Sequence, residues 1–198
     1  IIMEATAHMT PWRLFVEKWK NCTLCPLHKQ RSNVVLAKGK IPADILLIGE
    51  APGASEDAVG RPFVGPAGYL LEQIVERAIP SKISVAYCNL VCCFPSEAKA
   101  RGDNQPEEEE ILACRPRLNE FIAIARPRLV VCVGTLASDY VEFDAWGKVQ
   151  GADVIAIDHP ARILRMPAVQ KGMAADRATT TIQLAVNKLL EAHSAASK

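Results

Sequence analysis

The sequence lacks both a long apolar run and an excess of charge of either sign. No stretch in its 198 residues approaches the roughly 20 apolar residues that a bilayer-spanning helix needs. Lysine and arginine total 23 and aspartate and glutamate total 22, so the net charge of +1 gives no general attraction to a polyanion. We therefore expect a soluble protein, in which a nucleic-acid partner would have to be bound by a local basic surface.

The N-terminal segment lacks the features of a secretion signal. Residues 1–10 contain no basic stretch followed by an apolar one, so we expect a cytoplasmic protein in a reducing compartment. We interpret residues 1–10 as an N-terminal extension that vector-encoded residues could supply, with Met9 as a candidate native start. Residues 11–198 have the length and apolar content of a single domain.

The seven cysteines do not form the even set that is typical of a disulfide framework, and in a cytoplasmic protein they indicate metal ligands or buried thiols. Cys22 and Cys25 have the C-x-x-C spacing that lets two thiolates reach one metal centre. Cys93 and Cys114 flank a polar loop and could supply two more ligands. Zinc with these four ligands remains an alternative, and a redox-active pair is disfavoured because Cys22 follows a predicted helix instead of a strand.

Short apolar runs alternate with amphipathic segments along the chain. The runs at 43–48, 83–91, 129–133 and 154–157 are predicted strands. Helices are predicted at 12–20, at 65–79, from Pro106 onward with Cys114 pointing inward, and at about 174–191. This alternation predicts an α/β fold with three α/β/α layers around a central, mostly parallel four-stranded sheet.

Polar residues follow the predicted strands at the sheet edge where ligands bind in parallel folds. Glu50 follows the first strand, Asn89 lies near the end of the second, and His159 follows the fourth. Phe63 lies in a loop rich in glycine and proline, where it could form an aromatic wall for a planar ligand, although core packing would explain it equally well. Each residue alone is often structural, and their shared edge is what predicts a binding site.

Several short motifs, taken in order, resemble family 4 uracil-DNA glycosylases, the iron–sulfur type, over about residues 22–165. The motifs that carry the resemblance are Cys22-Thr-Leu-Cys25, Ile45-Leu-Leu-Ile-Gly-Glu-Ala-Pro-Gly53, Gly60-Arg-Pro-Phe-Val-Gly65, Asn89-Leu-Val-Cys-Cys93, Ala113-Cys-Arg-Pro116 and His159-Pro160. The resemblance implies the fold of that superfamily. It also implies a monomeric DNA-repair hydrolase that releases uracil from single- or double-stranded DNA and leaves an abasic site.

The resemblance also implies a cofactor. The four cysteines named above, Cys22, Cys25, Cys93 and Cys114, would hold a [4Fe–4S] cluster with a structural role near the DNA. Cys92 is expected to point to the opposite side of an extended strand from Cys93. The loop between Cys93 and Cys114 is longer than is typical of the family, and it contains no histidine that could trap DNA covalently.

The resemblance assigns roles to the pocket residues. Phe63 would stack on a uracil flipped out of the DNA helix, and Asn89 would bind its edge and reject cytosine. His159 would donate a hydrogen bond to the departing uracil anion. Glu50 would bind or orient the attacking water, although it could instead hold backbone amides of its loop.

The rim of the implied pocket would contact the DNA. Backbone N–H groups of Ala51 and Gly53 would bind uracil or phosphate. Leu164 and Arg165 would act as a wedge in the space that the base leaves, with Arg162 and Arg165 on phosphates. Lys99 and Arg101 would contact phosphates from the other side, although each of these basic residues could instead be a solvated surface residue. Two rival interpretations remain, a catalytically weak module that binds uracil or damaged DNA, and a zinc-stabilised α/β domain of unrelated function.

Overall fold

A five-stranded sheet is the centre of the fold in the computed structural model, which describes residues 9–95 and 104–196. The strand order is β1-β3-β2-β4-β5, with bounds β1 (Lys38–Gly39), β2 (Ile45–Gly49), β3 (Val85–Asn89), β4 (Leu129–Val133) and β5 (Asp153–Ile157). Neighbours among β2 to β5 are parallel, whereas β1 is antiparallel to β3. The predicted α/β class is confirmed, but the predicted four strands omit β1, because two residues are too short to show an apolar pattern.

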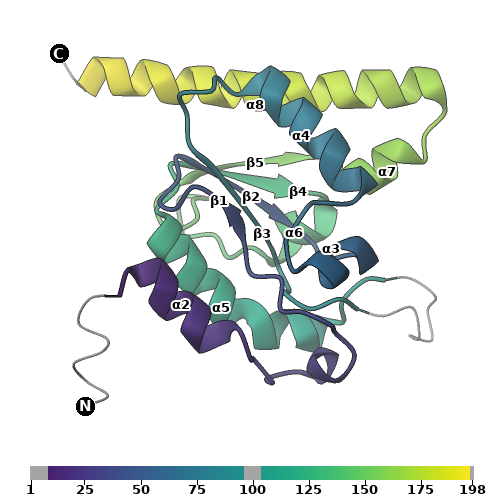
Figure 1. Ribbon diagram of the computed structural model, residues 1–198. Helices are drawn as coiled ribbons and strands as arrows, with labels where there is room; N and C mark the ends of the chain where they lie inside the picture. Colours follow the sequence, from purple (N-terminus) through teal and green to yellow (C-terminus); the bar gives the residue numbers. More distant parts are fainter. Residues whose placement is uncertain (1–8, 96–103, 197–198) are drawn as a thin grey trace.

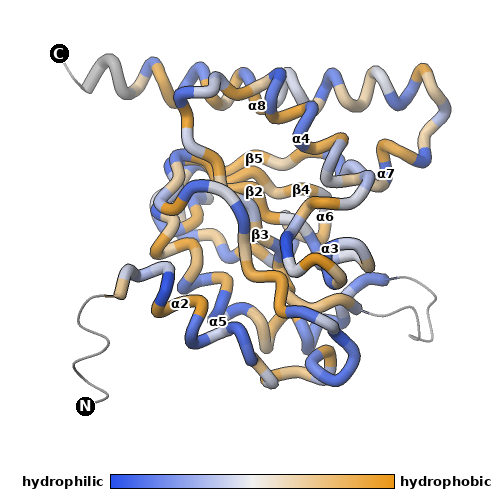
Figure 2. The backbone as a smooth tube through the Cα atoms, in the orientation of Figure 1, coloured by the Kyte–Doolittle hydropathy of each residue, from blue (hydrophilic) through white to orange (hydrophobic). Residues whose placement is uncertain are grey.

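The middle of the sheet is buried on both faces. Every residue of β2 and of β4 is buried, which explains why these segments read as continuous apolar runs in the sequence. Figure 2 shows that the strands form a largely hydrophobic centre. In the helices around them, hydrophobic and hydrophilic residues alternate along the chain. The core therefore consists of two apolar clusters, one on each face of the sheet.

The helices form two outer layers, as Figure 1 shows. One face is covered by α4 (Pro66–Ala78), α7 (Pro160–Leu164) and α8 (Ala168–Ala196), and the other by α2 (Pro11–Trp19) and α5 (Glu108–Ala125). Short elements complete the connections, namely η1 (Pro26–Lys29), α3 (Ala54–Val59) and α6 (Thr135–Tyr140). The three-layer prediction is confirmed, and α8 extends several residues beyond both ends of the predicted helix.

Helix α5 packs against helix α2 on one face of the sheet. Its apolar side packs on α2, where the rings of Phe15 and Phe121 lie 5.4 Å apart. Cys114 is buried on the same helix, as its spacing predicts. No helix among the described residues combines the length and the apolar character that crossing a membrane requires.

Candidate active site

A cavity of about 620 Å³ lies beyond the carboxyl ends of the parallel strands. It is lined by Glu50, Phe63, Asn89 and His159, so the four residues that sequence places at this edge do meet around one space. Its rim includes further residues expected there, namely Ala51, Gly53, Arg162 and Arg165. Leu164 ends α7 outside the set of lining residues. Lys99 and Arg101 lie outside the described part of the chain.

The wall of the cavity requires a glycine at position 49. A Cβ atom on Gly49 would lie 2.5 Å from Oδ1 of Asn89 and 2.6 Å from Cζ of Phe63. The amide oxygen and the aromatic ring therefore both close over the backbone at the end of β2. A planar ligand in the cavity can contact the ring face and the amide edge together.

Phe63 is held in an unusual backbone conformation. Its φ angle is +53°, a left-handed value that costs a non-glycine residue of order 1–3 kcal/mol unless the surroundings enforce it. Lys38 on β1 donates to the Phe63 carbonyl at 2.9 Å. A Cβ on Gly68 would lie only 2.2 Å from the carbonyl carbon of Phe63, so α4 approaches this loop at van der Waals contact. Both contacts fix the ring at the cavity wall.

His159 is held as a neutral hydrogen-bond donor. It is the N-cap of α7, and its Nδ1 accepts from the backbone N–H of Ala161 at 3.2 Å. Burial, together with the charge of Arg165, lowers the pKa of the imidazole below 6.5. Because Nδ1 is an acceptor in this contact, the single proton of the neutral ring is on Nε2, which can donate to a ligand.

A second carboxylate, that of Glu56, shapes the loop around the cavity, a role that is not predicted above from the sequence. It accepts from the backbone N–H groups of Gly53 at 3.1 Å, Val64 at 2.9 Å and Gly65 at 2.7 Å. The contact of the Gly53 amide with uracil or phosphate stays a prediction, and it would have to share this donor with Glu56 or displace it. The signal was present, since a cap residue followed three positions later by glutamate is the capping-box pattern.

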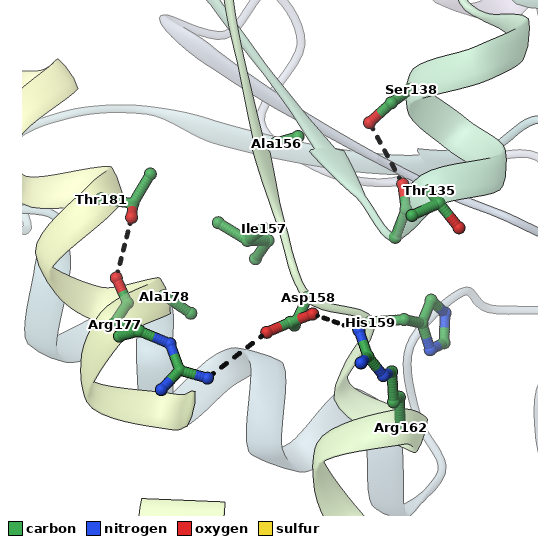
Figure 3. Close-up of a pocket in the computed structure, with 11 residues that line it drawn as sticks. Thr135, Ser138, Ala156, Ile157, Asp158, His159, Arg162, Arg177, Ala178 and Thr181 are labelled. Carbon is green, nitrogen blue, oxygen red and sulfur yellow. Dashed lines mark hydrogen bonds and ion pairs between the residues drawn. The ribbon is translucent and has the colours of Figure 1, made fainter. Parts of the chain in front are cut away.

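A smaller cavity of about 400 Å³ adjoins the first and shares its His159 and Arg162. Figure 3 shows Asp158 between two guanidinium groups in this cavity. The Asp158 carboxylate lies 2.8 Å from Nη1 of Arg162 and 3.9 Å from Nη2 of Arg177. The pair with Asp158 thus restrains Arg162, which lines both cavities. An anion bound just outside the larger cavity could contact the Arg162 guanidinium.

Five of the seven cysteines lie outside the strands of the sheet, namely Cys22, Cys25, Cys92, Cys93 and Cys114. All seven are free thiols. Burial, and then the nearby charges of Cys114, Glu110 and Cys22, raise the pKa of the Cys25 thiol, so the C-x-x-C segment lies beside α5. Within residues 9–95 and 104–196, no three cysteine, histidine or acidic side chains form a group that could hold a single metal ion.

The expected orientation of Cys92 is wrong. Its Sγ lies 3.7 Å from Sγ of Cys114, so it faces the same cysteines as its neighbour Cys93. The reason is that β3 ends at Asn89 and the chain bends at positions 92 and 93, where the alternation of an extended strand no longer holds. The thiols of Cys22, Cys25, Cys92, Cys93 and Cys114 therefore lie near one another, and these five residues form the cysteine region.

Two arginines contact these thiols. Arg31 donates to Sγ of Cys93 at 3.1 Å, and the fully buried Arg117 donates to Sγ of Cys114 at 3.4 Å. The spacing of Arg117 from Cys114 puts it on the inward side of α5, but its burial is not predicted from sequence, because arginine is an uncommon core residue. Asn104 and Gln105 also line the larger cavity, so the end of the long loop reaches the candidate site.

The chain matches known proteins over the segment that contains this cavity. A model of the uracil DNA glycosylase superfamily matches residues 36–182. A type-4 uracil-DNA glycosylase of Pyrobaculum aerophilum is 35% identical over 168 residues, which cover 76% of this chain and 83% of that protein. The chain belongs to the uracil-DNA glycosylase superfamily. Type-4 members of Saccharolobus solfataricus, at 34% identity over 82% of each chain, and of Thermotoga maritima, at 35% over 75% of this chain and 81% of its own, are further relatives.

The resemblance to type-4 members of the superfamily is thereby confirmed. A type-5 uracil-DNA glycosylase of Pyrobaculum aerophilum also matches, at 30% identity over 73% of each chain. The superfamily segment begins at residue 36, so it includes the cavity residues and Cys93 and Cys114 but not Cys22 and Cys25.

Proposed function

We propose that this protein is a uracil-DNA glycosylase that hydrolyses the bond between N1 of uracil and C1′ of deoxyribose in DNA. The observation that carries the proposal is the convergence of Glu50, Phe63, Asn89 and His159 on one cavity in a chain of this superfamily. Such a cavity holds a base only after the base has left the helix, because the glycosidic bond is inaccessible within stacked DNA.

Recognition of uracil rests on Phe63 and Asn89. The Phe63 ring offers a flat apolar face to the flipped pyrimidine, and the Asn89 amide offers one donor and one acceptor to its edge. Asn89 is 3% exposed, so an amide left unpaired by the wrong base would be a buried, unsatisfied polar group. Cytosine, whose donor and acceptor positions differ from those of uracil, is rejected on this ground.

Bond cleavage rests on His159 and Glu50. As the N1–C1′ bond breaks, its electron pair moves to uracil and positive charge develops on the sugar. The Nε2–H group of neutral His159 donates to the uracil anion, which it stabilises more than the bound neutral base. Glu50, which lines the cavity, orients the water whose oxygen adds to C1′, and the proton that this water loses neutralises the departing uracil anion.

The donor set of the cysteine region fits an iron–sulfur cluster. Four cysteine thiolates hold a [4Fe–4S] cluster through different irons, so they need not crowd around a single ion. Cys22, Cys25, Cys93 and Cys114 come from three segments of the chain, and the arginine contacts to two of them favour the thiolate form. The cluster would supply a structural link between these segments and the long loop. A reducing, cytoplasmic compartment would suit this chemistry.

The test is incubation with an oligonucleotide that contains one deoxyuridine, followed by alkaline cleavage at abasic sites. Wild type is expected to give product, and His159→Ala and Asn89→Ala are each expected to lose at least roughly tenfold in rate, about 1.4 kcal/mol of transition-state stabilisation. Equal rates in all three proteins would remove the site assignment. Binding without product would favour a module that recognises uracil without cleaving it.

The cofactor has an independent readout. Protein purified without oxygen is expected to be brown, with broad visible absorption and about four irons per chain. Colourless protein that contains zinc would overturn the cluster and leave the cavity assignment to be judged by the excision assay alone.

A further inference from the structure

Arg117 is a fully buried arginine between the cysteine region and the cavity. Its Nη2 donates to the backbone carbonyl of Asn89 at 2.8 Å, to that of Leu90 at 2.7 Å, and to Sγ of Cys114 at 3.4 Å. Its Nε and Nη1 atoms are buried and have no hydrogen-bond partner among the described residues. The side chain thus touches both Asn89, at the cavity, and Cys114, at the thiols.

A guanidinium in this position requires a negative charge nearby. Arginine stays protonated in proteins, and an unpaired charge in the interior costs several kcal/mol. The nearest group that could carry this charge is Sγ of Cys114, 3.4 Å from Nη2 of Arg117, and Sγ of Cys92 lies 3.7 Å from that sulfur. Neutral thiols provide little compensation, whereas thiolates bound to iron carry the charge that the site needs.

We propose that Arg117 is the buried counter-charge of the iron–sulfur cluster and the positioning residue that connects the cluster to Asn89. This inference rests on the cluster of the proposed function. The two unpartnered N–H groups are donors available to sulfur, and the bonded Nη2 fixes the backbone at the residue that recognises uracil. Loss of the cluster would leave Arg117 uncompensated and so disturb Asn89.

Two substitutions separate the charge of Arg117 from the geometry of its hydrogen-bond donors. Arg117→Met removes the charge and keeps an unbranched side chain, whereas Arg117→Lys keeps the charge and loses the planar fork. Arg115→Met is the matched control, because Arg115 lies on the same helix, also has a buried Nε without a partner, and pairs with Glu142 at the surface.

The first measurement is the decay of the visible absorption of the cluster after an iron chelator is added to the purified, loaded proteins. Arg117→Met is expected to lose the cluster at least roughly tenfold faster than wild type, since removing one partner of a buried charge pair is strongly destabilising. Arg117→Lys and Arg115→Met are expected to stay within about threefold of wild type.

The second measurement is the affinity for an oligonucleotide that contains 2′-fluorodeoxyuridine, which resists hydrolysis. Arg117→Lys is expected to bind it roughly tenfold more weakly while retaining the cluster, because one of the carbonyls at Asn89 and Leu90 loses its donor. A merely structural role would not produce this separation of cluster retention from uracil affinity.

The outcomes distinguish this inference from the proposed function. A brown wild type together with wild-type cluster decay in Arg117→Met overturns the role of Arg117 alone. If Arg117→Met does not fold, Arg117→Lys decides, and wild-type affinity for the fluorinated substrate overturns the positioning role. A colourless wild type overturns the cluster and this inference with it, whatever the excision assay gives.

Discussion

At the scale of single residues, the missing side chain of Gly49 shapes the base pocket as much as the side chains around it. The Asn89 amide and the Phe63 ring both approach the backbone at this point. The atoms that a methyl group would meet are the far ends of two side chains, so the fold can adapt to it by moving them. The adaptation would displace the groups proposed to hold uracil.

Gly49→Ala is therefore expected to fold and to lose activity. We predict a loss of at least roughly tenfold in single-turnover excision, with a far-UV circular dichroism spectrum like that of wild type. Gly172→Ala on α8 is the matched control, since a Cβ there meets nothing within 4 Å, and it is expected to keep full activity and gain up to about 1 kcal/mol in stability. Full activity of Gly49→Ala would contradict the described pocket.

The pH dependence of excision tests the state of His159. The active ring is neutral, and its pKa is lowered below 6.5 by burial and then by Arg165, so activity is expected to persist through pH 6.5 and to fall only below it. Arg165→Ala removes one cause and should move the acidic limb of the rate profile to higher pH. Arg162→Ala, which removes a neighbouring arginine that is not among those causes, should leave the limb in place.

The same ring makes stability depend on pH in a defined direction. Because the folded protein binds the His159 proton less readily than the unfolded chain does, this contribution to the free energy of unfolding is present above pH 6.5 and is lost as pH falls through the lowered pKa. An excision rate of wild type that already falls above pH 6.5 as the pH is lowered would contradict the assignment of His159 as a neutral donor.

Only some residues of the candidate site could be predicted from the sequence. The positions of Glu50, Asn89 and His159 at the carboxyl edge of the sheet could be predicted. Each lies at or just after the end of an apolar run that forms a parallel strand, and such strands end at one edge. For Arg117 the spacing from Cys114 indicates only that it faces inward, whereas the backbone carbonyls of Asn89 and Leu90 that bind it belong to a distant segment and could not be predicted. The hydrogen bond from the Gly53 amide to Glu56 was not predicted, although the three-residue spacing of the two is a local sequence signal for it.

At the scale of elements, the edge strand β1 positions the aromatic wall of the cavity. Lys38 lies on this strand with only 9% of its side chain exposed, and its Nζ contacts both the Phe63 carbonyl and the Glu72 carboxylate. The contacts join segments 25 and 34 residues apart in the sequence. No local pattern encodes such a contact, which is why both the strand and its role escape prediction from sequence.

Lys38→Met is expected to weaken both the loop and the enzyme. The Phe63 carbonyl would lose a charged donor, so we predict a destabilisation of about 1–3 kcal/mol by chemical denaturation and weaker binding of uracil-containing DNA. Lys18→Met is the control, because the Lys18 side chain is 59% exposed and its pair with Glu120 should contribute less than about 1 kcal/mol. Equal effects of the two substitutions would argue against a specific role for β1.

At the scale of the whole molecule, a nearly neutral chain has to bind a polyanion through local charge. The net charge is +1, whereas Arg162 and Arg165 stand together at the rim of the cavity. Asp158 restrains Arg162 without burying it, so the guanidinium can still meet a phosphate. The layered fold places this rim beyond the carboxyl edge of the sheet.

The salt dependence of binding tests this arrangement. Arg162→Ala is expected to weaken binding to uncleavable uracil-containing DNA and to reduce the slope of log affinity against log salt by about 1, as expected for one lost phosphate contact. Arg77→Ala, an exposed arginine of α4 paired with Asp176, should leave the slope unchanged. An unchanged slope in Arg162→Ala would place the DNA on another surface.

The central claim is that a flat pyrimidine fits between Phe63 and Asn89 and receives a hydrogen bond from Nε2 of His159. The most direct measurement is a titration of the protein with free uracil, followed through the imidazole signals of His159 by NMR. We predict a neutral ring with its proton on Nε2 and a shift of that signal with uracil but not with cytosine, abolished in Gly49→Ala. Saturable uracil binding that leaves the His159 signals unchanged would contradict the account.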